Sequence, residues 1–319
     1  MTSLRESMPM AEAFHPDYRE LLDSDVWAFI DQTNALFPPE AAKLPMAAQR
    51  VAYNAMAAAF RAPPPAEVAH RDLILSSIWP LRCRNYLPVG APDDRALLYF
   101  HGGGFVFGDL DTHGDICADI AARTSLRLLS ADYRLAPEHI HPAALEDALA
   151  AFDWLAASTS KIVLIGESAG GSLVAALSYL RRGHGALAGQ LLIYPSLGGD
   201  QTTGSYVEHA NAPLLATADL DEYVRLRTGG SFDPDDAALF PLRAADFSGL
   251  PPTVIVTAQC DPLADDGSAY AQSINQAGGA ARCREEQRLP HSFMRARRIT
   301  RRGSEAFDAI IQDLLTLAS

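Results

Sequence analysis

The sequence has few cysteines, and their spacing matches no metal-binding or redox motif. Four occur in 319 residues, Cys83, Cys117, Cys260 and Cys283, and no two form a C-x-x-C pair. This argues against a zinc ribbon and a thioredoxin-like site. A chain of this length can bury a large core without disulfides or metal ions, so we expect free thiols in a reducing compartment.

Positive charge is also scarce. The chain has 26 Lys and Arg against 39 Asp and Glu, which gives a formal net charge of −13 at pH 7. Nucleic acids and anionic membranes both require a basic surface, so neither is expected as a partner. Hydrophobic residues make up 48% and charged residues 20%. That balance is ordinary for a folded globular protein and excludes a mainly disordered chain.

Long hydrophobic runs are missing as well. No stretch approaches the roughly 18 apolar residues of a transmembrane helix. Arg5, Glu6 and Glu12 interrupt the N-terminal segment, so no secretory signal is expected. The sequence contains no internal repeat and no low-complexity tract. We therefore expect a cytoplasmic protein.

From about residue 72 onward, short apolar runs alternate with helical segments. The runs predict strands at 73–75, 83–87, 96–100, 126–131, 162–165, 191–194, 253–258 and, as a more polar edge strand, 282–287. Helices are predicted at 116–123, 143–157, 168–182, 263–277 and 307–317. Such alternation predicts an α/β fold, with a mostly parallel sheet covered by helices on both faces.

Two segments do not follow this alternation. Residues 1–70 have helical periodicity, and residues 198–240 are rich in Gly, Thr and Asp with one helical piece at 220–226. We expect the first to form a helical cap segment and the second a cap excursion from a catalytic domain at 71–319. The aromatic residues on the first predicted helices, Trp27 and Phe29, are expected to pack in the core or cap.

The motif Gly-Glu-Ser-Ala-Gly at 166–170 lies between a predicted strand and a predicted helix. G-x-S-x-G in this position is typical of a nucleophile elbow, a sharp turn that forces the serine into a strained backbone conformation. Glycines two before and two after Ser168 avoid clashes with the neighbouring strand and helix. A phosphate-binding loop also places Gly and Ser at such a turn, but its Lys-Ser/Thr ending is missing. Ser168 is thus the predicted nucleophile.

The motif His-Gly-Gly-Gly at 101–104 follows the third predicted strand. An oxyanion needs two or three N–H groups aimed at one position, and glycines leave room for the substrate. We predict that Gly103, Gly104 and Ala169 supply these groups and that His101 orders the loop by hydrogen bonding. The alternative interpretation is a flexible turn. Two bulky residues after the glycines are predicted to bind substrate and narrow the acyl side: Phe105 and Phe107.

A serine nucleophile needs a base, and the base needs an orienting acid. In this type of fold they follow the serine in the order acid, then histidine. His291 is the only one of the nine histidines beyond the last predicted strand. Asp261 follows the strand at 253–258, whereas Asp265 and Asp266 fall inside the next predicted helix. We predict Asp261 as the acid and His291 as the base.

Together these motifs resemble those of the hormone-sensitive-lipase-like α/β hydrolases, which include bacterial carboxylesterases and acetyl esterases. Five motifs occur in the family's order: His101–Gly104, Asp132–His139 with Pro142-Ala143, Gly166–Gly170, Asp261–Asp265 and His291–Phe293. The resemblance covers about residues 72–319 and implies an eight-stranded sheet, a Ser–His–Asp triad, an oxyanion loop and esters of modest acyl length. Residues 132–139 are interpreted as a structural corner fixed by Arg134 and Glu138.

The chain departs from the family's pattern at three positions. Phe105 stands where Trp is usual, Glu167 where Asp is common, and Ser292 where Gly is usual after the histidine. The first two bear on the acyl pocket and on the support of the elbow. None of the three removes a group that the mechanism needs.

The sequence thus predicts a serine carboxylesterase that acts on a small-molecule ester without a cofactor or metal. An amidase or arylformamidase would use the same residues, and matched hydrolysis of p-nitrophenyl acetate and an acyl anilide would separate the two. A non-catalytic ligand-binding protein of this fold is disfavoured because Ser168, Asp261 and His291 are all present. The sequence leaves open whether the chain forms a homodimer.

Overall fold

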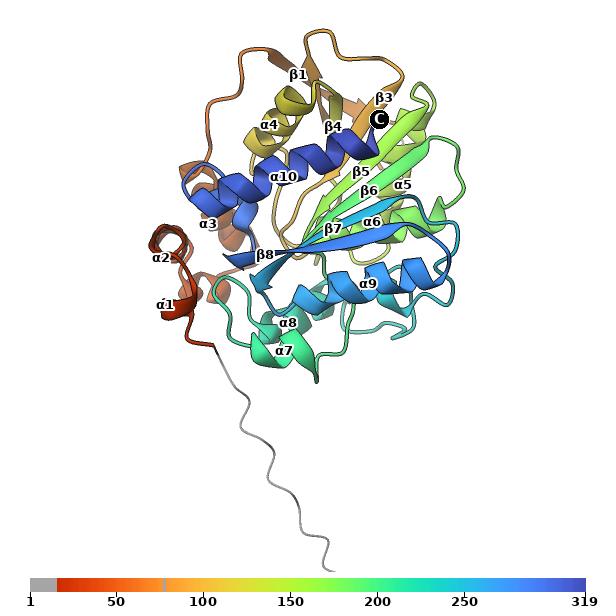
Figure 1. The fold of residues 1–319 in the computed structure, drawn as a ribbon. Coiled ribbons are helices and arrows are strands. Elements are labelled where there is room, and N and C mark those ends of the chain that lie inside the picture. Colours follow the sequence, from red (N-terminus) through yellow and green to blue (C-terminus); the bar gives the residue numbers. More distant parts are fainter. Residues whose placement is uncertain (1–15, 77–78) are drawn as a thin grey trace, which may run out of the picture.

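An eight-stranded sheet forms the centre of the computed structural model, which describes residues 16–76 and 79–319 (Figure 1). The strands lie in the order β1-β2-β4-β3-β5-β6-β7-β8, and only β1–β2 and β2–β4 pair antiparallel. Their bounds are β1 Val68–Leu75, β2 Leu81–Pro88, β3 Arg95–Phe100, β4 Arg127–Ala131, β5 Lys161–Glu167, β6 Leu187–Ile193, β7 Thr253–Cys260 and β8 Ala281–Pro290. The predicted α/β fold is therefore confirmed, and the polar strand β8 does lie at an edge.

Helices cover both faces of this sheet. One face packs against α4 (Gly114–Thr124) and α10 (Arg301–Leu317). The other packs against α5 (Ala143–Ala156), α6 (Ala169–Leu180) and α9 (Ala264–Gln276). Because successive strand residues point to opposite faces, β3 divides its side chains between the two cores. Both cores are apolar, which explains why β3 appears in the sequence as one continuous apolar run.

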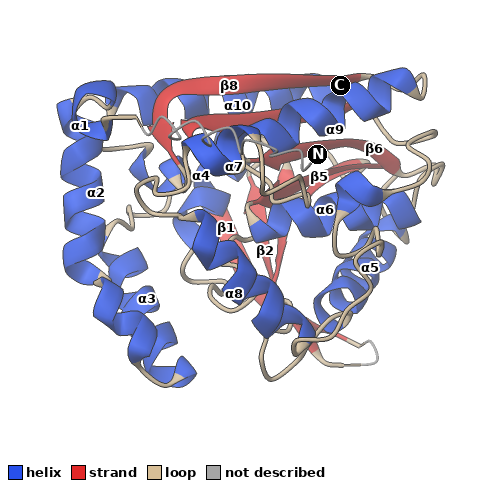
Figure 2. Ribbon diagram, turned by 90° about the horizontal axis from the view of Figure 1, so that it is seen from below, coloured by secondary structure: helices blue, strands red, loops and turns tan. Residues whose placement is uncertain are grey.

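The N-terminal segment folds into helices at one end of the sheet. They are α1 (Tyr18–Leu21), α2 (Ser24–Leu36), η1 (Pro39–Lys43) and α3 (Met46–Ala59). Figure 2 shows α2 and α3 along one side of the molecule. Val26, Phe29 and Ile30 of α2 are buried and join the core beneath α4 and α10. The first strand, β1, begins a few residues before the predicted change at residue 72.

The excursion at 198–240 contains two helices, α7 (Gly204–Glu208) and α8 (Thr217–Thr228), where the sequence predicted one. A 3-10 turn, η2 (Pro241–Arg243), follows it. In Figure 2, α8 lies in the middle of the view, between the N-terminal helices and α5. The excursion and the N-terminal helices, which are far apart in the sequence, thus lie at the same end of the molecule.

The last helix, α10, begins six residues before the predicted start at 307. Its first turn is polar, so the apolar pattern does not mark it. Thr300 provides the start signal, because its Oγ accepts a hydrogen bond from the amide of Gly303 at 3.1 Å.

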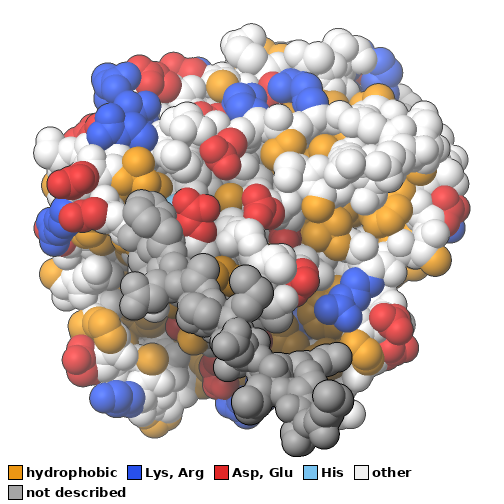
Figure 3. Space-filling view, turned by 60° about the horizontal axis from the view of Figure 1, so that its bottom comes forward, with side chains coloured by type: hydrophobic (Ala, Val, Ile, Leu, Met, Phe, Trp, Pro, Cys, Tyr) orange, Lys and Arg blue, Asp and Glu red, His pale blue; other side chains and the backbone are white. Residues whose placement is uncertain are grey.

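On the face seen in Figure 3, acidic and basic side chains are interspersed, with small hydrophobic groups between them. Among residues 16–76 and 79–319, no helix combines the length and the hydropathy needed to cross a membrane.

Candidate active site

Ser168 occupies the sharp turn between β5 and α6 that the motif predicts. Its backbone angles are φ 53° and ψ −116°, in a region that side chains other than glycine rarely adopt. A Cβ on Gly166 would lie 2.1 Å from the carbonyl oxygen of Gly170, and a Cβ on Gly170 would lie 2.1 Å from that of Phe100. Only glycine fits at either position, so the motif's spacing is a steric requirement of the turn.

The structure brings the three predicted residues Ser168, His291 and Asp261 into one hydrogen-bonded chain. Nδ1 of His291 lies 2.6 Å from Oδ2 of Asp261, and Nε2 lies 2.9 Å from Oγ of Ser168. Asp261 is completely buried, and its other oxygen accepts from the amide of Leu263 at 2.9 Å. If Nδ1 carries the proton to the carboxylate, Nε2 is free to accept the serine proton.

The two competing aspartates are engaged elsewhere. Asp265 accepts from the amide of Ser205 at 2.8 Å, and Asp266 accepts from the amide of Leu197 at 2.6 Å. Both lie within α9, as predicted. Burial raises the pKa of Asp266 to about 7.

A buried carboxylate, Glu167, is linked to His291 through the side chain of Tyr194. Its two oxygens accept hydrogen bonds from the hydroxyls of Tyr99 at 2.9 Å and Tyr194 at 2.8 Å. The Tyr194 ring in turn contacts the His291 ring, with centroids 4.7 Å apart. Glu167 is one of the three departures from the family pattern, and its place in this network identifies it as a support of the elbow.

Ser292, another departure, has a left-handed backbone with φ 64°. Glycine adopts that conformation at no steric cost, which accounts for the usual Gly at this position.

The glycine loop runs beside the nucleophile. A Cβ on Gly102 would lie 3.4 Å from Cβ of Ser168. Gly103 and Gly104 have φ values of 118° and 62°, and a Cβ on Gly103 would lie only 2.4 Å from the carbonyl oxygen of Phe107. This tight conformation is specific to glycine, so the alternative of a merely flexible turn is not supported.

His101 stabilises this loop from inside the protein, as expected. It is fully buried, and its Nδ1 lies 2.8 Å from the carbonyl oxygen of Gly102. Its ring stacks on that of Tyr133 with centroids 4.3 Å apart. Burial lowers the pKa of His101 to about 4, so the imidazole is neutral at pH 7.

Residues of α3 and α8, in the two segments predicted to form a cap, contact the same loop, and the sequence did not reveal these contacts. On α3, Arg50 donates to the carbonyl oxygen of Val106 at 2.8 Å, and the Tyr53 ring stacks on Phe107 at 5.1 Å. On α8, the Tyr223 ring lies 2.5 Å from where a Cβ on Gly104 would be. Also on α8, the Arg227 guanidinium lies 3.7 Å from the centroid of the Phe105 ring. No local pattern marks these residues, because their partners are 54 to 122 positions away.

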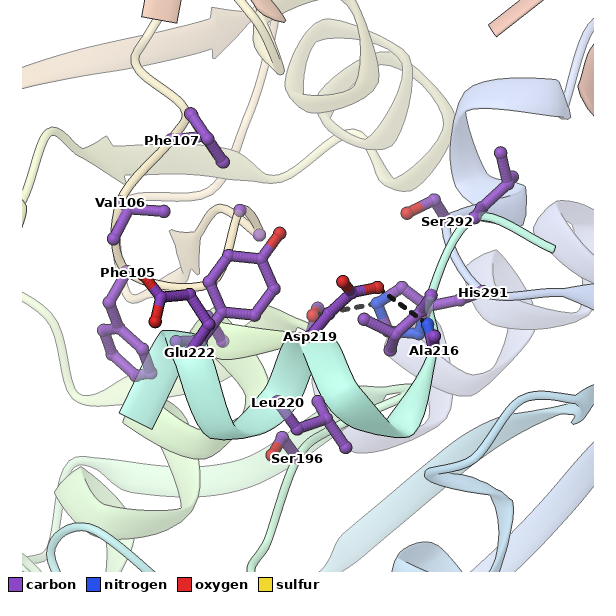
Figure 4. A pocket seen from close by; sticks show the side chains of 18 of the residues that line it. Phe105, Val106, Phe107, Ser196, Ala216, Asp219, Leu220, Glu222, His291 and Ser292 are labelled. Atoms are coloured by element: carbon purple, nitrogen blue, oxygen red, sulfur yellow. Dashed lines mark hydrogen bonds between the residues drawn. The ribbon is translucent and has the colours of Figure 1, made fainter. Parts of the chain in front are cut away.

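A cavity of about 730 Å³ extends from Ser168 and His291 to both cap segments (Figure 4). Phe105 and Phe107, predicted to bind substrate, both contribute to its lining, as do Phe29 and Tyr223. Phe29 was expected only to pack in the core or cap. Figure 4 shows Phe107 on the opposite side of the cavity from Leu220 of α8.

The segment at 132–139 forms a corner held by side-chain contacts. Arg134 donates to Asp147 at 2.9 Å and to the carbonyl oxygen of Ala143 at 3.0 Å, as expected for a structural corner. Glu138 forms an ion pair with Arg50. All four cysteines are free. Within the described ranges, no three His, Cys, Asp or Glu side chains are grouped to hold a metal ion.

Known proteins similar to this chain in sequence and fold include several esterases. A family described as an alpha/beta hydrolase fold matches residues 97–295. Esterase LipI of Mycobacterium tuberculosis is 39% identical over 228 residues, which cover 67% of this chain and 71% of LipI. Carboxylesterase NlhH of the same organism is 35% identical over 248 residues, 74% of this chain and 75% of NlhH. An esterase structure from Pyrobaculum calidifontis superposes with a TM-score of 0.84 at 30% identity, over 93% of this chain and 99% of that one.

Proposed function

The chain belongs to the hormone-sensitive-lipase-like family of α/β hydrolases and is a carboxylic ester hydrolase, and from that premise we propose that Ser168 is its nucleophile and short-chain acyl esters are its substrates. The observation that carries the proposal is the pair of contacts of His291, at 2.6 Å to Asp261 and 2.9 Å to Ser168. This is the arrangement in which an imidazole can take the serine proton during attack.

In the first half of the reaction, Oγ of Ser168 attacks the ester carbonyl carbon while Nε2 of His291 takes the hydroxyl proton. The negative charge that develops on the carbonyl oxygen is stabilised by the amides of Gly103, Gly104 and Ala169. Ala169 is the first residue of α6, so the positive end of the helix dipole adds to this stabilisation. Asp261 stabilises the imidazolium that forms.

In the second half, Nε2 of His291 gives its proton to the leaving alkoxide oxygen, and an acyl-enzyme remains on Ser168. His291 then takes a proton from water, whose oxygen attacks the acyl carbon. Collapse of this second tetrahedral intermediate returns the proton to Oγ and releases the carboxylic acid. Asp261 retains its negative charge throughout.

We also propose that the helices at 16–59 and the excursion at 198–240 act as a two-part cap. Both contribute residues to the cavity, including Phe29 and Tyr53 from one and Leu220 and Tyr223 from the other. A roofed cavity suits a small ester and leaves little room for a long acyl chain. Phe105 and Phe107 are proposed to limit the acyl length.

The test is covalent labelling of the nucleophile. Diethyl p-nitrophenyl phosphate should release one equivalent of p-nitrophenolate and add a diethylphosphoryl group to the peptide that contains Ser168. Ser168→Ala should remove the label and lower kcat on p-nitrophenyl acetate by a factor on the order of 10⁶. Ser160→Ala, at an exposed serine, is the matched control and should change neither. Labelling at another residue, or faster turnover of the matched acetanilide than of the ester, would contradict the proposal.

A further inference from the structure

Three arginines follow His291 closely in sequence, and two of them are paired with carboxylates. Nη2 of Arg297 lies 2.6 Å from Asp115 and 2.7 Å from Asp119, and Arg298 also pairs with Asp119. The third, Arg295, is the one that lines the cavity. Within residues 16–76 and 79–319, no carboxylate oxygen lies within 4.0 Å of its guanidinium.

Among the described residues, the hydrogen-bond partners of Arg295 are neutral and lie at long distances. Its side chain is buried, with the residue 9% exposed. Nη1 donates to the carbonyl oxygen of Thr112 at 3.4 Å, and Nη2 donates to the hydroxyl of Tyr53 at 3.3 Å. Both distances exceed the usual range of about 2.7–3.2 Å for such bonds. Glu167 and Asp115 attract this guanidinium only from beyond ion-pair distance, so it keeps hydrogen-bonding capacity for an anionic ligand.

Glu167, which also lines the cavity, does not use that capacity. Each of its oxygens already accepts a tyrosine hydroxyl, and it is not paired with Arg295. Two other arginines line the cavity. Arg225 is paired with Glu222 at 2.6 Å, whereas the Arg227 guanidinium lies over the Phe105 ring and donates to the carbonyl oxygens of Ala238 and Leu239. Arg295 is therefore the most available of the three.

The position of Arg295 relates it to the leaving group. Nε2 of His291 protonates the leaving oxygen, so the alcohol part of the ester must lie on the His291 side of Ser168. Arg295 is four residues beyond His291, on η3 (Phe293–Ala296), and contacts Tyr53, whose ring stacks on Phe107. Arg295 and Tyr53 line the same cavity as His291 and therefore border the space for the alcohol.

We propose that this space recognises a carboxylate carried by the alcohol part of the ester, and that Arg295 binds it. The inference rests on the proposed esterase function. A guanidinium presents paired N–H groups that match the two oxygens of a carboxylate, and such charged hydrogen bonds are the stronger ones in proteins. The ring of Tyr53 suits an aromatic alcohol, so a carboxyphenyl ester is the substrate class that fits best.

The experiment compares 4-carboxyphenyl acetate with 4-carbamoylphenyl acetate, which has nearly the same shape and no charge. Values of kcat/KM at pH 8 are each divided by the rate of hydroxide-catalysed hydrolysis of the same ester. The wild type should prefer the carboxylate by about tenfold, the size expected of one charge-assisted contact. This result would be unexpected from the net charge of −13, which repels anions.

Arg295→Gln should remove the preference, and Arg295→Lys should restore part of it. Arg298→Gln removes the same formal charge three residues away, outside the cavity lining, and should leave the ratio unchanged. Because each ratio is measured within one variant, a general loss of active enzyme cancels.

A wild-type ratio of one or below, or an unchanged ratio in Arg295→Gln, would overturn the inference while leaving the esterase function intact. Failure to hydrolyse either ester would instead contradict the proposed esterase function, and this inference with it. If Arg295→Gln does not fold, the wild type still decides: benzoate should compete with the neutral ester about tenfold better than benzamide. Equal inhibition by the two would count against a carboxylate site.

Discussion

The side chain of Arg50 is tied to the backbone of Val106: its Nε donates to the carbonyl oxygen of Val106 at 2.8 Å. Its Nη2 donates to the carbonyl oxygen of Ala136 at 2.7 Å, and Glu138 pairs with the guanidinium. One residue of α3 thus fixes both the loop that carries the predicted oxyanion donors and the neighbouring corner. The N-terminal helices therefore contribute to the geometry of the site as well as to its cover.

Replacing Arg50 should consequently affect catalysis more than binding. In Arg50→Gln the loop loses the bond to Val106, and the amides of Gly103 and Gly104 are less well aimed at the oxyanion. We expect kcat on p-nitrophenyl acetate to fall by roughly tenfold to a hundredfold, less than complete removal of a donor, with KM nearly unchanged. Steady-state kinetics measure both constants.

Glu138→Gln is the matched control, because it removes the ion pair but keeps both bonds from Arg50 to backbone carbonyls. It should change kcat by less than about threefold, as for a partly exposed ion pair. A rise in KM without a fall in kcat in Arg50→Gln would mean that Arg50 only shapes the cavity.

The second prediction concerns the acid. Asp261→Asn should keep the position of His291 but favour the wrong imidazole tautomer, which lowered kcat about 10⁴-fold in another enzyme with such a triad. Asp265→Asn keeps a side-chain oxygen that can accept from the amide of Ser205, so its effect on kcat should be small. Kinetics on p-nitrophenyl acetate for the two variants, side by side, decide the assignment. If Asp265→Asn were the more harmful change, Asp261 would not be the acid.

The sequence was sufficient for the parts of this protein that depend on local pattern. Apolar runs located seven of the eight strands, and a more polar segment located β8. The order of the motifs grouped Ser168, Asp261 and His291 as members of one site. The elbow is predictable because its glycines are required by contacts within a few residues or with the adjacent strand. The polar composition of β8 likewise follows from its place at the sheet edge.

The sequence was insufficient where a side chain acts on a distant segment. Arg50, Tyr53 and Tyr223 lie on helices whose sequences show only ordinary helical character, yet each contacts the loop at 102–107. The helix α7 is short, and no side chain caps its start, so no local pattern predicts it. Arg295 cannot be told apart from Arg297 and Arg298 by sequence. In the structure its side chain lines the cavity, whereas theirs pair with carboxylates.

The third prediction is a loss of stability in mild acid. His101 is buried and neutral, with its pKa lowered to about 4, whereas an unfolded histidine titrates near 6.5. Because protonation is harder in the folded than in the unfolded protein, the folded state keeps its full stability above pH 6.5. It loses free energy of unfolding as the pH falls from 6.5 toward 4. By linkage, His101 should cost about 2 kcal/mol of unfolding free energy at pH 5 relative to pH 7. Burial lowers the pKa of His113 too, so it acts in the same direction.

Urea unfolding of the wild type and His101→Phe at pH 7 and pH 5 measures this effect. The variant should be less stable at pH 7, because it loses the contact with Gly102, but its further loss at pH 5 should be smaller by about 2 kcal/mol. His70→Gln, at an exposed histidine, should behave like the wild type. An identical pH dependence in His101→Phe would show that another group controls acid stability.

The last prediction is the preferred acyl length. The cavity of about 730 Å³ must hold the whole ester, and Phe105 and Phe107 take up part of its wall. Each added methylene contributes about 0.8 kcal/mol if it is fully buried, so kcat/KM should rise over the first few carbons. Once the chain meets the cavity wall, steric exclusion outweighs that gain. We expect a maximum between acetyl and about hexanoyl across p-nitrophenyl esters from C2 to C16, with little hydrolysis of emulsified triolein and no rise in rate above the substrate's solubility limit. Phe107→Ala should move the maximum to longer chains if this ring limits the acyl side. A maximum at C12 or beyond in the wild type, or interfacial activation, would mean that the cap opens to lipid and that the enzyme acts as a lipase.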